Sequence, residues 1–416
     1  KQHETAREKY FGTLKKSGLG LILLSSITLA ACSQASQSSA KTSSSVSNVS
    51  ISSENTTEST AATGYFSDSD YDASYDAATA STINLSGSSA TVSGDGVEVS
   101  GSVVTISAEG TYIVSGSSEN VQIVVNAADS AKVQLVLDNA NMTGNNAAIS
   151  VQEADTVTVT LAEGSKNSIS DSASNSNDEE DAAIFSKSDL VFNGSGSLSV
   201  KGQYNNAIES NDSLRITGGD YSIESVGDGL NAKDALNITG ASLDIAAGED
   251  AVKADNDEDS TLGNLYISDA NLTISAGDDG IHASNASVID SGTIQVTSST
   301  EAIEGTNVTI NGGSLDLYAT DDGINASSDV TGAEIFIKVT GGDIKLEVGQ
   351  GDTDALDSNG DLIVSGGSLD ITAQFAFDFD GTAEYSGGNL TVNGETVTEI
   401  TNSMMMGGGG GRPGGR

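Results

Sequence analysis

Between positions 183 and 376 the chain repeats one hydrophobic pattern at intervals of roughly 22 residues, an interval typical of repeat architectures. The small residues at positions 207, 229 and 251 mark three successive copies. Each copy alternates apolar and polar residues over two short segments joined by a turn, as in LRITGGDYSIES (214–225) and LNITGASLDIAA (236–247). Such period-two alternation predicts β-strands with one buried face. A third short strand is predicted where a small residue precedes a large apolar one, as in GDGLNA (227–232) and DDGINA (321–326).

Three strands in about 22 residues correspond to one rung of a parallel β-helix. Stacked rungs bury a continuous core that no single rung can bury. The inward columns that we expect are Ile216, Ile238, Ile267 and Ile310, and Leu243, Leu272, Leu315 and Leu369. Residues 80–175 keep the strand pattern with a looser period, so we expect them to form irregular first rungs. A propeller would need a longer, four-strand repeat, and a sandwich would not explain the constant interval.

The composition supports short strands and tight turns. The 416 residues include 48 Gly, one Pro and no Trp, and aromatic residues make up 4%. Lys and Arg number 17 against 59 Asp and Glu, which gives a formal net charge of -42. No basic stripe is visible, so we expect no nucleic-acid partner. An anionic surface would also be repelled unless cations bridge the two.

Residues 1–31 have the pattern of a bacterial signal peptide. Lys15 and Lys16 precede a short apolar run that ends in LAAC at Cys32, the one cysteine of the chain. The sequence Leu29–Cys32 resembles a lipoprotein lipobox, which implies lipid attachment at Cys32 and anchoring on the extracellular face of the bacterial membrane. An ordinary signal peptide with an incidental cysteine is the alternative.

Four regions follow from these patterns: the leader 1–31, a Ser/Thr-rich tether 32–79, a β-helical domain 80–400 and a Gly/Met-rich tail 401–416, which we expect to be disordered. Within the tether, GYFSDSDYDASYD (64–76) is acidic and aromatic. We expect this segment to cap the folded domain, with cation binding as the alternative.

Acidic residues recur beside the small residue of each third strand. Equivalent side chains of stacked rungs lie about 4.8 Å apart, so these acids should form columns. Neighbouring unit charges at that distance cost roughly 3–4 kcal/mol per pair at an effective dielectric near 20. A column of several charges therefore needs raised pKa values or bridging cations.

Calcium is the cation that we expect, because it prefers carboxylate, amide and carbonyl oxygens and spans a distance close to the rung spacing. A small neighbouring residue would let the strands pack closely and leave the ion room. A further column is expected two residues after the small residue, and Lys253 and His282 interrupt it, so cation binding should not be uniform along it. A solvated acidic turn is the alternative. The candidate ligands are Asp228, Asn231, Asp250, Asp278, Asp279, Glu301, Glu304, Asp321, Asp322, Asn325, Asp354 and Asp357.

Several segments in order, among them GTYIVSG, VQLVLDNA, LAEGSKNSISD, AIESNDSLRITGG and GDGLNAKDALNITG, resemble one known family. It is the carbohydrate-binding parallel β-helix family of bacterial extracellular proteins, and the similarity covers roughly residues 80–400. The resemblance implies a right-handed parallel β-helix, bound calcium and non-catalytic binding of acidic polysaccharide such as polygalacturonate, or of cellulose. It leaves the glycan of this chain undetermined.

Candidate sugar-stacking residues, in the absence of Trp, are Tyr204, Tyr221, Tyr266 and Tyr318, although Tyr221 and Tyr318 fall at or near strand positions and could pack structurally. A calcium-dependent polysaccharide lyase is an alternative function, with Lys233 or Lys253 as the base. No second basic residue accompanies either lysine to hold a substrate carboxylate. A surface adhesin or spacer is the other alternative. We expect a monomer.

Overall fold

The computed structural model describes residues 64–351 and 353–403, all within one compact unit, Thr60–Arg416. The predicted leader, Cys32, the tether as far as residue 63 and tail residues 404–416 lie outside the described residues. The described part is all-β, with 36 strands joined in one mostly parallel sheet. Its α-helix, α1 (Asp68–Tyr71), has four residues, and no helix among the described residues is long and apolar enough to cross a membrane.

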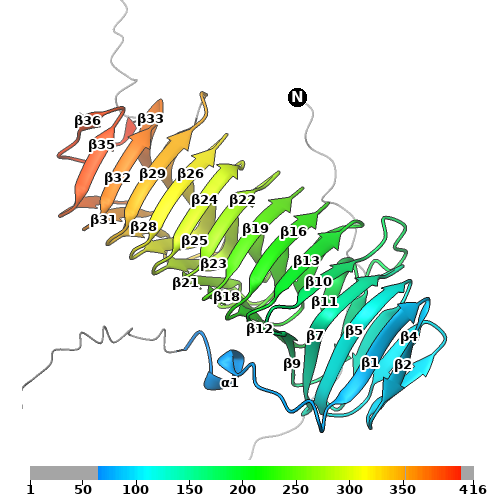
Figure 1. Cartoon of the computed structure of the whole chain (residues 1–416). Helices are drawn as coiled ribbons and strands as arrows, with labels where there is room; N and C mark the ends of the chain where they lie inside the picture. The colour runs from blue at the N-terminus through cyan, green and yellow to red at the C-terminus, as the bar shows by residue number, and fades with distance from the viewer. Residues whose placement is uncertain (1–63, 352, 404–416) are drawn as a thin grey trace, which may run out of the picture. The chain divides into compact units, whose positions relative to one another are not determined.

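From residue 182 onward, most strands pair in parallel with the third strand along the chain, so equivalent segments of successive repeats lie side by side. This pairing produces three stacks, which we call A, B and C. Figure 1 shows the strands of stack A following one another in chain order, from β1 in blue to β35 in red. The interval of the repeat in the sequence is therefore the interval between paired strands.

Stack A consists of β1 (Ser81–Gly87), β5 (Gly110–Glu119), β7 (Lys132–Thr143), β10 (Lys166–Ser170), β13 (Ser197–Gly202), β16 (Asp220–Ser225), β19 (Ser242–Ala247), β22 (Asn271–Ser275), β24 (Thr293–Ser298), β26 (Ser314–Ala319), β29 (Asp343–Val348), β32 (Ser368–Thr372) and β35 (Asn389–Val392).

Stack B consists of β4 (Val103–Ile106), β6 (Gln122–Asn126), β8 (Ile149–Glu153), β11 (Ala182–Ser186), β14 (Asn206–Ser210), β17 (Leu230–Ala232), β20 (Val252–Ala254), β23 (Ile281–Ile289), β25 (Ile303–Ile310), β27 (Ile324–Ala326), β30 (Asp354–Ser358) and β33 (Phe375–Phe379).

Stack C consists of β9 (Thr156–Leu161), β12 (Asp189–Gly194), β15 (Leu214–Ile216), β18 (Ala235–Thr239), β21 (Asn264–Ser268), β28 (Phe336–Val339), β31 (Asp361–Val364) and β34 (Ala383–Tyr385). The long strands join two stacks: the first half of β7 and the second halves of β23 and β25 also pair within stack C. Three antiparallel hairpins add β2 (Ser89–Ser93) to β1, β3 (Val97–Ser100) to β4 and β36 (Glu395–Thr396) to β35.

The predicted core columns are confirmed. Ile216 pairs with Ile238, which pairs with Ile267, and the column continues through Ile289 to Ile310. The second column contains isoleucine as well as leucine, since Ile294 lies between Leu272 and Leu315. These side chains are at most 3% exposed and belong to one hydrophobic cluster. Alternation along each strand therefore sends one apolar set inward and leaves the polar set outside.

Residues 65–79, which we call the strap, contact stack C between Tyr65 and Ser74, within the segment predicted as tether. The Asn193 side chain donates to the carbonyl oxygens of Asp70 and Asp72 at 3.2 and 3.1 Å. Asn237 donates to the Tyr65 carbonyl at 2.9 Å, and the Tyr65 ring stacks on Tyr266 with centroids 3.7 Å apart. The segment that was predicted to cap the domain thus lies along part of stack C. Its contacts come from distant parts of the chain, which the local sequence does not reveal.

Candidate functional site

The first acidic column is a hydrogen-bonded ladder that leads into the strands of stack B. We call it the inner column; its members are Asn206, Asp228, Asp250, Asp279, Glu301, Asp322 and Asp354. A side-chain oxygen accepts the backbone N–H of the next member at five positions: Asn206, Asp228, Asp250, Asp279 and Asp322. The distances are 2.8 Å from Asp228 N to Asn206, 3.0 Å from Asp250 N to Asp228, 2.9 Å from Asp279 N to Asp250, 3.3 Å from Glu301 N to Asp279 and 2.7 Å from Asp354 N to Asp322.

This ladder provides part of the charge stabilisation that the sequence analysis assigned to bridging cations. An amide N–H directed at a carboxylate favours its charged form, so repulsion along the column is reduced by the backbone. The carboxylates of Asp228, Asp250 and Asp279 are nevertheless buried, with 3–5% exposed. Burial opposes the charge of a carboxylate unless such partners offset it.

The second column lies beside the first. We call it the outer column; strand pairing places its members in one register as Glu209, Asn231, Lys253, His282, Glu304, Asn325, Asp357 and Asp378. Asn231 donates from Nδ2 to Asp228 Oδ2 at 2.8 Å, and Asn206 donates to Glu209 Oε2 at 2.8 Å. Asn231 therefore directs a donor at the inner column, where the sequence predicted a metal-ligating oxygen.

Lys253 and His282 act as cations within the columns. Lys253 Nζ lies 2.8 Å from Asp250 Oδ2 and 3.5 Å from Asp228 Oδ2. Burial opposes the lysine charge, but these two carboxylates outweigh it and raise the pKa of Lys253. His282 Nδ1 lies 2.7 Å from Glu304 Oε2 and 3.2 Å from Asp279 Oδ2. Burial is again outweighed by the two acids, and the pKa of His282 rises to about 10, so this imidazole is protonated at neutral pH.

Several carboxyl groups keep high pKa values. Burial, followed by the hydrogen bond to Asp279, raises the pKa of Glu301 to about 9. Burial raises the pKa of Glu209 to about 7, although the Asn206 hydrogen bond opposes it. For Asp357, burial and then the charges of Asp322 and Asp378 raise the pKa to about 7. Glu301 and Asp357 are two of the predicted metal ligands, and their raised pKa values mean that a proton competes with a metal ion at these positions.

Three carboxylates form the arrangement that best fits a calcium ion among the described residues. Ligand oxygens of Asp250, Asp278 and Asp279 lie within 4.8 Å of one another, with Asp250 and Asp279 buried and Asp278 exposed. Calcium is bound by such oxygens from several carboxylates. A second group, Asp279, His282 and Glu304, has the same spread, but Nδ1 of His282 already contacts both carboxylates at the position that a cation would take.

The structure separates the remaining predicted ligands into a C-terminal group. Asp322, Asp354, Asp357 and Asp378 lie near one another. Burial raises the pKa of Asp357 most, and the charges of Asp322, Asp378 and Asp354 raise it further. Asp321 lies beside Asp322 and raises the pKa of that residue, also after burial. Asn325 lies in register between Glu304 and Asp357. Sequence analysis missed Asp378, although the pattern FAFDF (375–379) keeps the spacing of the outer column.

The small residue between the columns is explained by close packing, which is one of the two reasons predicted. A Cβ at Gly229 would lie 2.6 Å from the Ala251 carbonyl oxygen and 2.6 Å from Ile245 Cγ2. At Gly280 it would lie 2.7 Å from the Ala302 carbonyl oxygen. Close contact with the next repeat and with the core therefore limits side-chain size, whether or not an ion is bound.

The candidate tyrosines occupy different environments. Tyr221 is 4% exposed and its hydroxyl donates to the Gly218 carbonyl at 2.7 Å. Tyr266 is 2% exposed beneath Tyr65. Neither ring has a face free to stack on a sugar. The prediction that Tyr221 and Tyr266 are sugar-stacking residues is therefore wrong, and both rings pack structurally. Tyr204 donates to Asp178 at 2.6 Å, and Tyr318 is half-buried on β26.

The exposed aromatic rings of the strap were not anticipated. Tyr71 and Tyr75 are 53% and 38% exposed, more than any other aromatic side chain in the described part of the chain. Phe66 packs between Tyr71 and Tyr266, with ring centroids 5.8 and 6.1 Å away. The aromatic content of residues 64–76 was the available signal, but the sequence favoured a cap.

Comparisons with known proteins concern carbohydrate binding. A family model described as carbohydrate-binding domain-containing protein matches residues 100–353 and 284–405. A carbohydrate-binding domain-containing protein of Acetivibrio thermocellus is 31% identical over 121 residues, or 28% of this chain and 42% of the relative. The match thus spans less than half of that relative. A solved structure, the polysaccharide lyase-like protein from C. thermocellum as a gadolinium derivative, is 23% identical with a TM-score of 0.47, over 75% of this chain and 100% of that one.

Proposed function

Because this chain belongs to the family of carbohydrate-binding domain-containing proteins, we propose that it binds polysaccharide without cleaving it, through calcium held at the acidic columns. The observation that carries the proposal is the convergence of Asp250, Asp278 and Asp279 within 4.8 Å. Acidic polysaccharide such as polygalacturonate is the ligand class that this chemistry fits best, and cellulose is the neutral alternative.

Charge explains why a cation is needed. A protein with a formal net charge of -42 repels a polyuronate unless positive charge lies between them. Calcium accepts six to eight oxygens, so three protein carboxylates leave positions for oxygens of the glycan. The exposed carboxylate of Asp278 lies on the solvent side of the group, where a glycan has access.

The protein residues have separate parts in this proposal. Asp250 and Asp279 are fixed by the inner ladder, since each accepts an N–H from the next repeat. Lys253 and His282 neutralise neighbouring carboxylates and thereby limit the number of ions that the columns require. The C-terminal group around Asp322, Asp354 and Asp357 is a further calcium candidate, because several carboxyl groups lie close together there, and calcium would have to displace the proton that the raised pKa of Asp357 favours.

The wider setting completes the proposal. We propose that the three stacks wind as a right-handed parallel β-helix, which the repeated parallel pairing and the strong preference for right-handed crossovers support. We also propose a monomer, lipid-anchored through Cys32 on the extracellular face of a bacterial membrane, which the LAAC sequence supports. The anchor would keep the binding domain at the cell surface.

Calorimetric titration with polygalacturonate in calcium and in EDTA tests the central proposal. We expect binding in calcium, loss in EDTA and recovery when calcium is restored. Asp278→Asn should weaken calcium-dependent binding about tenfold or more, equivalent to one lost charged contact. Asp343→Asn on β29, an exposed aspartate of stack A, is the matched control. Equal binding with and without calcium would overturn the proposal.

Polysaccharide lyase activity is the alternative, because Lys253 lies beside the acidic group. A lyase base must release its proton near the working pH. The two carboxylates around Lys253 instead outweigh burial and raise its pKa. Lys233, the other candidate base, is 3.8 Å from Glu258. Absorbance of unsaturated uronate after incubation with polygalacturonate and calcium would establish the lyase instead. Absence of binding on a glycan array would favour an adhesin or spacer.

A further inference from the structure

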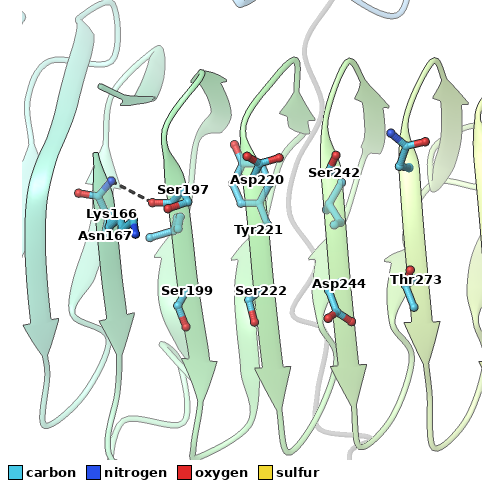
Figure 2. A pocket seen from close by; sticks show the side chains of 13 residues that line it. Lys166, Asn167, Ser197, Ser199, Asp220, Tyr221, Ser222, Ser242, Asp244 and Thr273 are labelled. Atoms are coloured by element: carbon cyan, nitrogen blue, oxygen red, sulfur yellow. Dashed lines mark hydrogen bonds between the residues drawn. The ribbon is translucent and has the colours of Figure 1, made fainter. Parts of the chain in front are cut away.

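A recess of about 510 Å³ lies on the outer face of stack A, away from the strands that carry the acidic columns. It extends across β10, β13, β16, β19 and β22, and Figure 2 shows its side chains in two rows across these strands. Pockets of this size accommodate small-molecule or oligomeric ligands. None of the lining residues belongs to the acidic columns.

Strand pairing defines the two rows. The first, which we call row 1, contains Lys166, Ser197, Asp220, Ser242 and Asn271, and the second, row 2, contains Ser199, Ser222, Asp244 and Thr273. Members of a row are about 4.8 Å apart, and the rows are two residues apart along each strand, or roughly 6.6 Å. From β13 to β22, every repeat therefore presents two short polar or acidic side chains at a constant interval.

The recess exists because these side chains are short. Between the rows lie Leu198, Tyr221 and Leu243, which are at most 4% exposed and line the floor of the recess. Serine, threonine, asparagine and aspartate leave this floor accessible, whereas a long side chain would cover it. Lys166 stands at one end of row 1 (Figure 2).

The chemistry of the rows indicates the ligand. Carboxylates accept hydrogen bonds, while hydroxyl and amide groups both donate and accept. Asp220 and Asp244 occupy neighbouring repeats but different rows, so each carboxylate is next to serine along its own row. Such a surface suits sugar hydroxyls. It repels uronate carboxylates, because the calcium proposed at the acidic columns does not lie between Asp220 or Asp244 and a ligand bound in the recess.

We propose that this recess binds a neutral polysaccharide chain directly, without a metal ion, by hydrogen bonds from rows 1 and 2 to its hydroxyl groups. The chain lies along the stacking direction, so successive sugars meet successive repeats. This inference rests on the proposed function in assuming a polysaccharide ligand, but it assigns a separate surface and a separate ligand class. The protein then has two binding surfaces, one dependent on calcium and one independent of it.

The test uses a soluble neutral β-glucan in EDTA as the probe, with Ser242→Arg as the variant. Arginine at this half-buried outward position fills the recess and leaves the core untouched. Ser368→Arg on β32 is the matched control, since Ser368 is half-buried in the same row position outside the recess. We expect Ser242→Arg to weaken glucan binding about tenfold or more and Ser368→Arg to leave it unchanged. Both variants should keep calcium-dependent polygalacturonate binding.

The results separate this inference from the proposed function. If the wild-type protein in EDTA does not bind the glucan, or if Ser242→Arg binds it normally, the recess is not the site, whatever happens with polygalacturonate. If Ser242→Arg loses only polygalacturonate binding, the ligand class is wrong. Asp278→Asn should retain glucan binding in EDTA, and its loss would contradict the independence of the two surfaces.

Discussion

Nζ of Lys253 lies 2.8 Å from Oδ2 of Asp250, three residues earlier in the chain. The pair shows how the columns remain stable without a metal ion at every repeat. The lysine also reaches Asp228 at 3.5 Å, so one cation serves two inner-column carboxylates. The columns therefore combine carboxylates with backbone amides and basic side chains.

Lys253→Met should destabilise the protein by about 3 kcal/mol, because it leaves two buried carboxylates without their cation. Urea unfolding in EDTA measures the loss. Lys233→Met is the control. Lys233 is more exposed than Lys253, and its ion pair with the exposed Glu258 is long, at 3.8 Å, so this substitution should have little effect. Saturating calcium should restore part of the stability of Lys253→Met. An unchanged unfolding midpoint would show that Lys253 is not needed to neutralise the column.

Calcium should stabilise the folded protein in proportion to its affinity. A ligand at one hundred times its dissociation constant adds about 2.7 kcal/mol per site. We expect the melting temperature to rise with calcium and to return after EDTA dialysis, with a smaller rise in Asp278→Asn. In EDTA that variant should be slightly more stable than the wild type, because burial and the charge of Asp279 raise the pKa of Asp278. Identical melting in EDTA and calcium would refute a calcium site.

The stability of the metal-free protein should fall as pH rises. Glu301 has a folded pKa of about 9 against an ordinary 4.5, so its contribution is complete below 4.5 and lost as pH rises through 9. The pKa of His282 is about 10 in the folded protein against an ordinary 6.5, so its contribution to stability is complete below pH 6.5 and is lost as pH rises through 10. Melting in EDTA should therefore decline from about pH 5 to about pH 10.

Glu301→Gln should make that decline shallower, because glutamine stays neutral throughout. Glu224→Gln is the control, since Glu224 is exposed and paired with Lys201. At the acid end the sign reverses for Asp279, whose pKa falls to about 2, against burial, because His282 and other neighbours hydrogen-bond it. Its contribution is present above 3.8 and is lost as pH falls through 2. A melting temperature that rises from pH 5 to pH 10 would contradict these assignments.

Asn206→Ala should destabilise the start of the inner ladder by about 1–3 kcal/mol, the cost of leaving the buried N–H of Asp228 without an acceptor. Amide hydrogen exchange at Asp228 provides a local measure. Asn206→Asp is the matched variant, since it retains the acceptor oxygen but loses the donor to Glu209. It should preserve protection at Asp228 and raise the pKa of Glu209. Equal protection in Asn206→Ala would show that the ladder bond contributes nothing.

Arg215→Met should release the strap. Arg215 lies 3.2 Å from Asp70 and 2.8 Å from Asp189, and Asp70 is only 4% exposed. Without the guanidinium, the buried Asp70 carboxylate loses its cation and favours leaving the surface. Proteolysis within residues 65–79 should become faster while the stacks stay folded. Lys201→Met, on an exposed ion pair, should leave cleavage unchanged, and unchanged cleavage in Arg215→Met would assign the strap to its other contacts.

The sequence by itself determined the all-β class, the interval of the repeat and the inward columns. Alternation along a strand is local, and the pattern at Ile216 recurs one repeat later at Ile238, its partner in the sheet. It also placed carboxylates such as Asp250 and Asp279 in one column, because equivalent positions of successive repeats come into register. The calcium and the lipid anchor stay predictions.

Only the tertiary structure decided what each carboxylate contacts. Asp250 receives an N–H from Asp279 and a charge from Lys253, and these depend on register and side-chain direction. The strap requires contacts between distant parts of the chain, as between Asp70 and Asn193. The recess depends on short residues being adjacent in space in five strands. Local alternation specifies which side of a strand is buried, but the partners of a polar group come from other repeats, and packing alone brings them together.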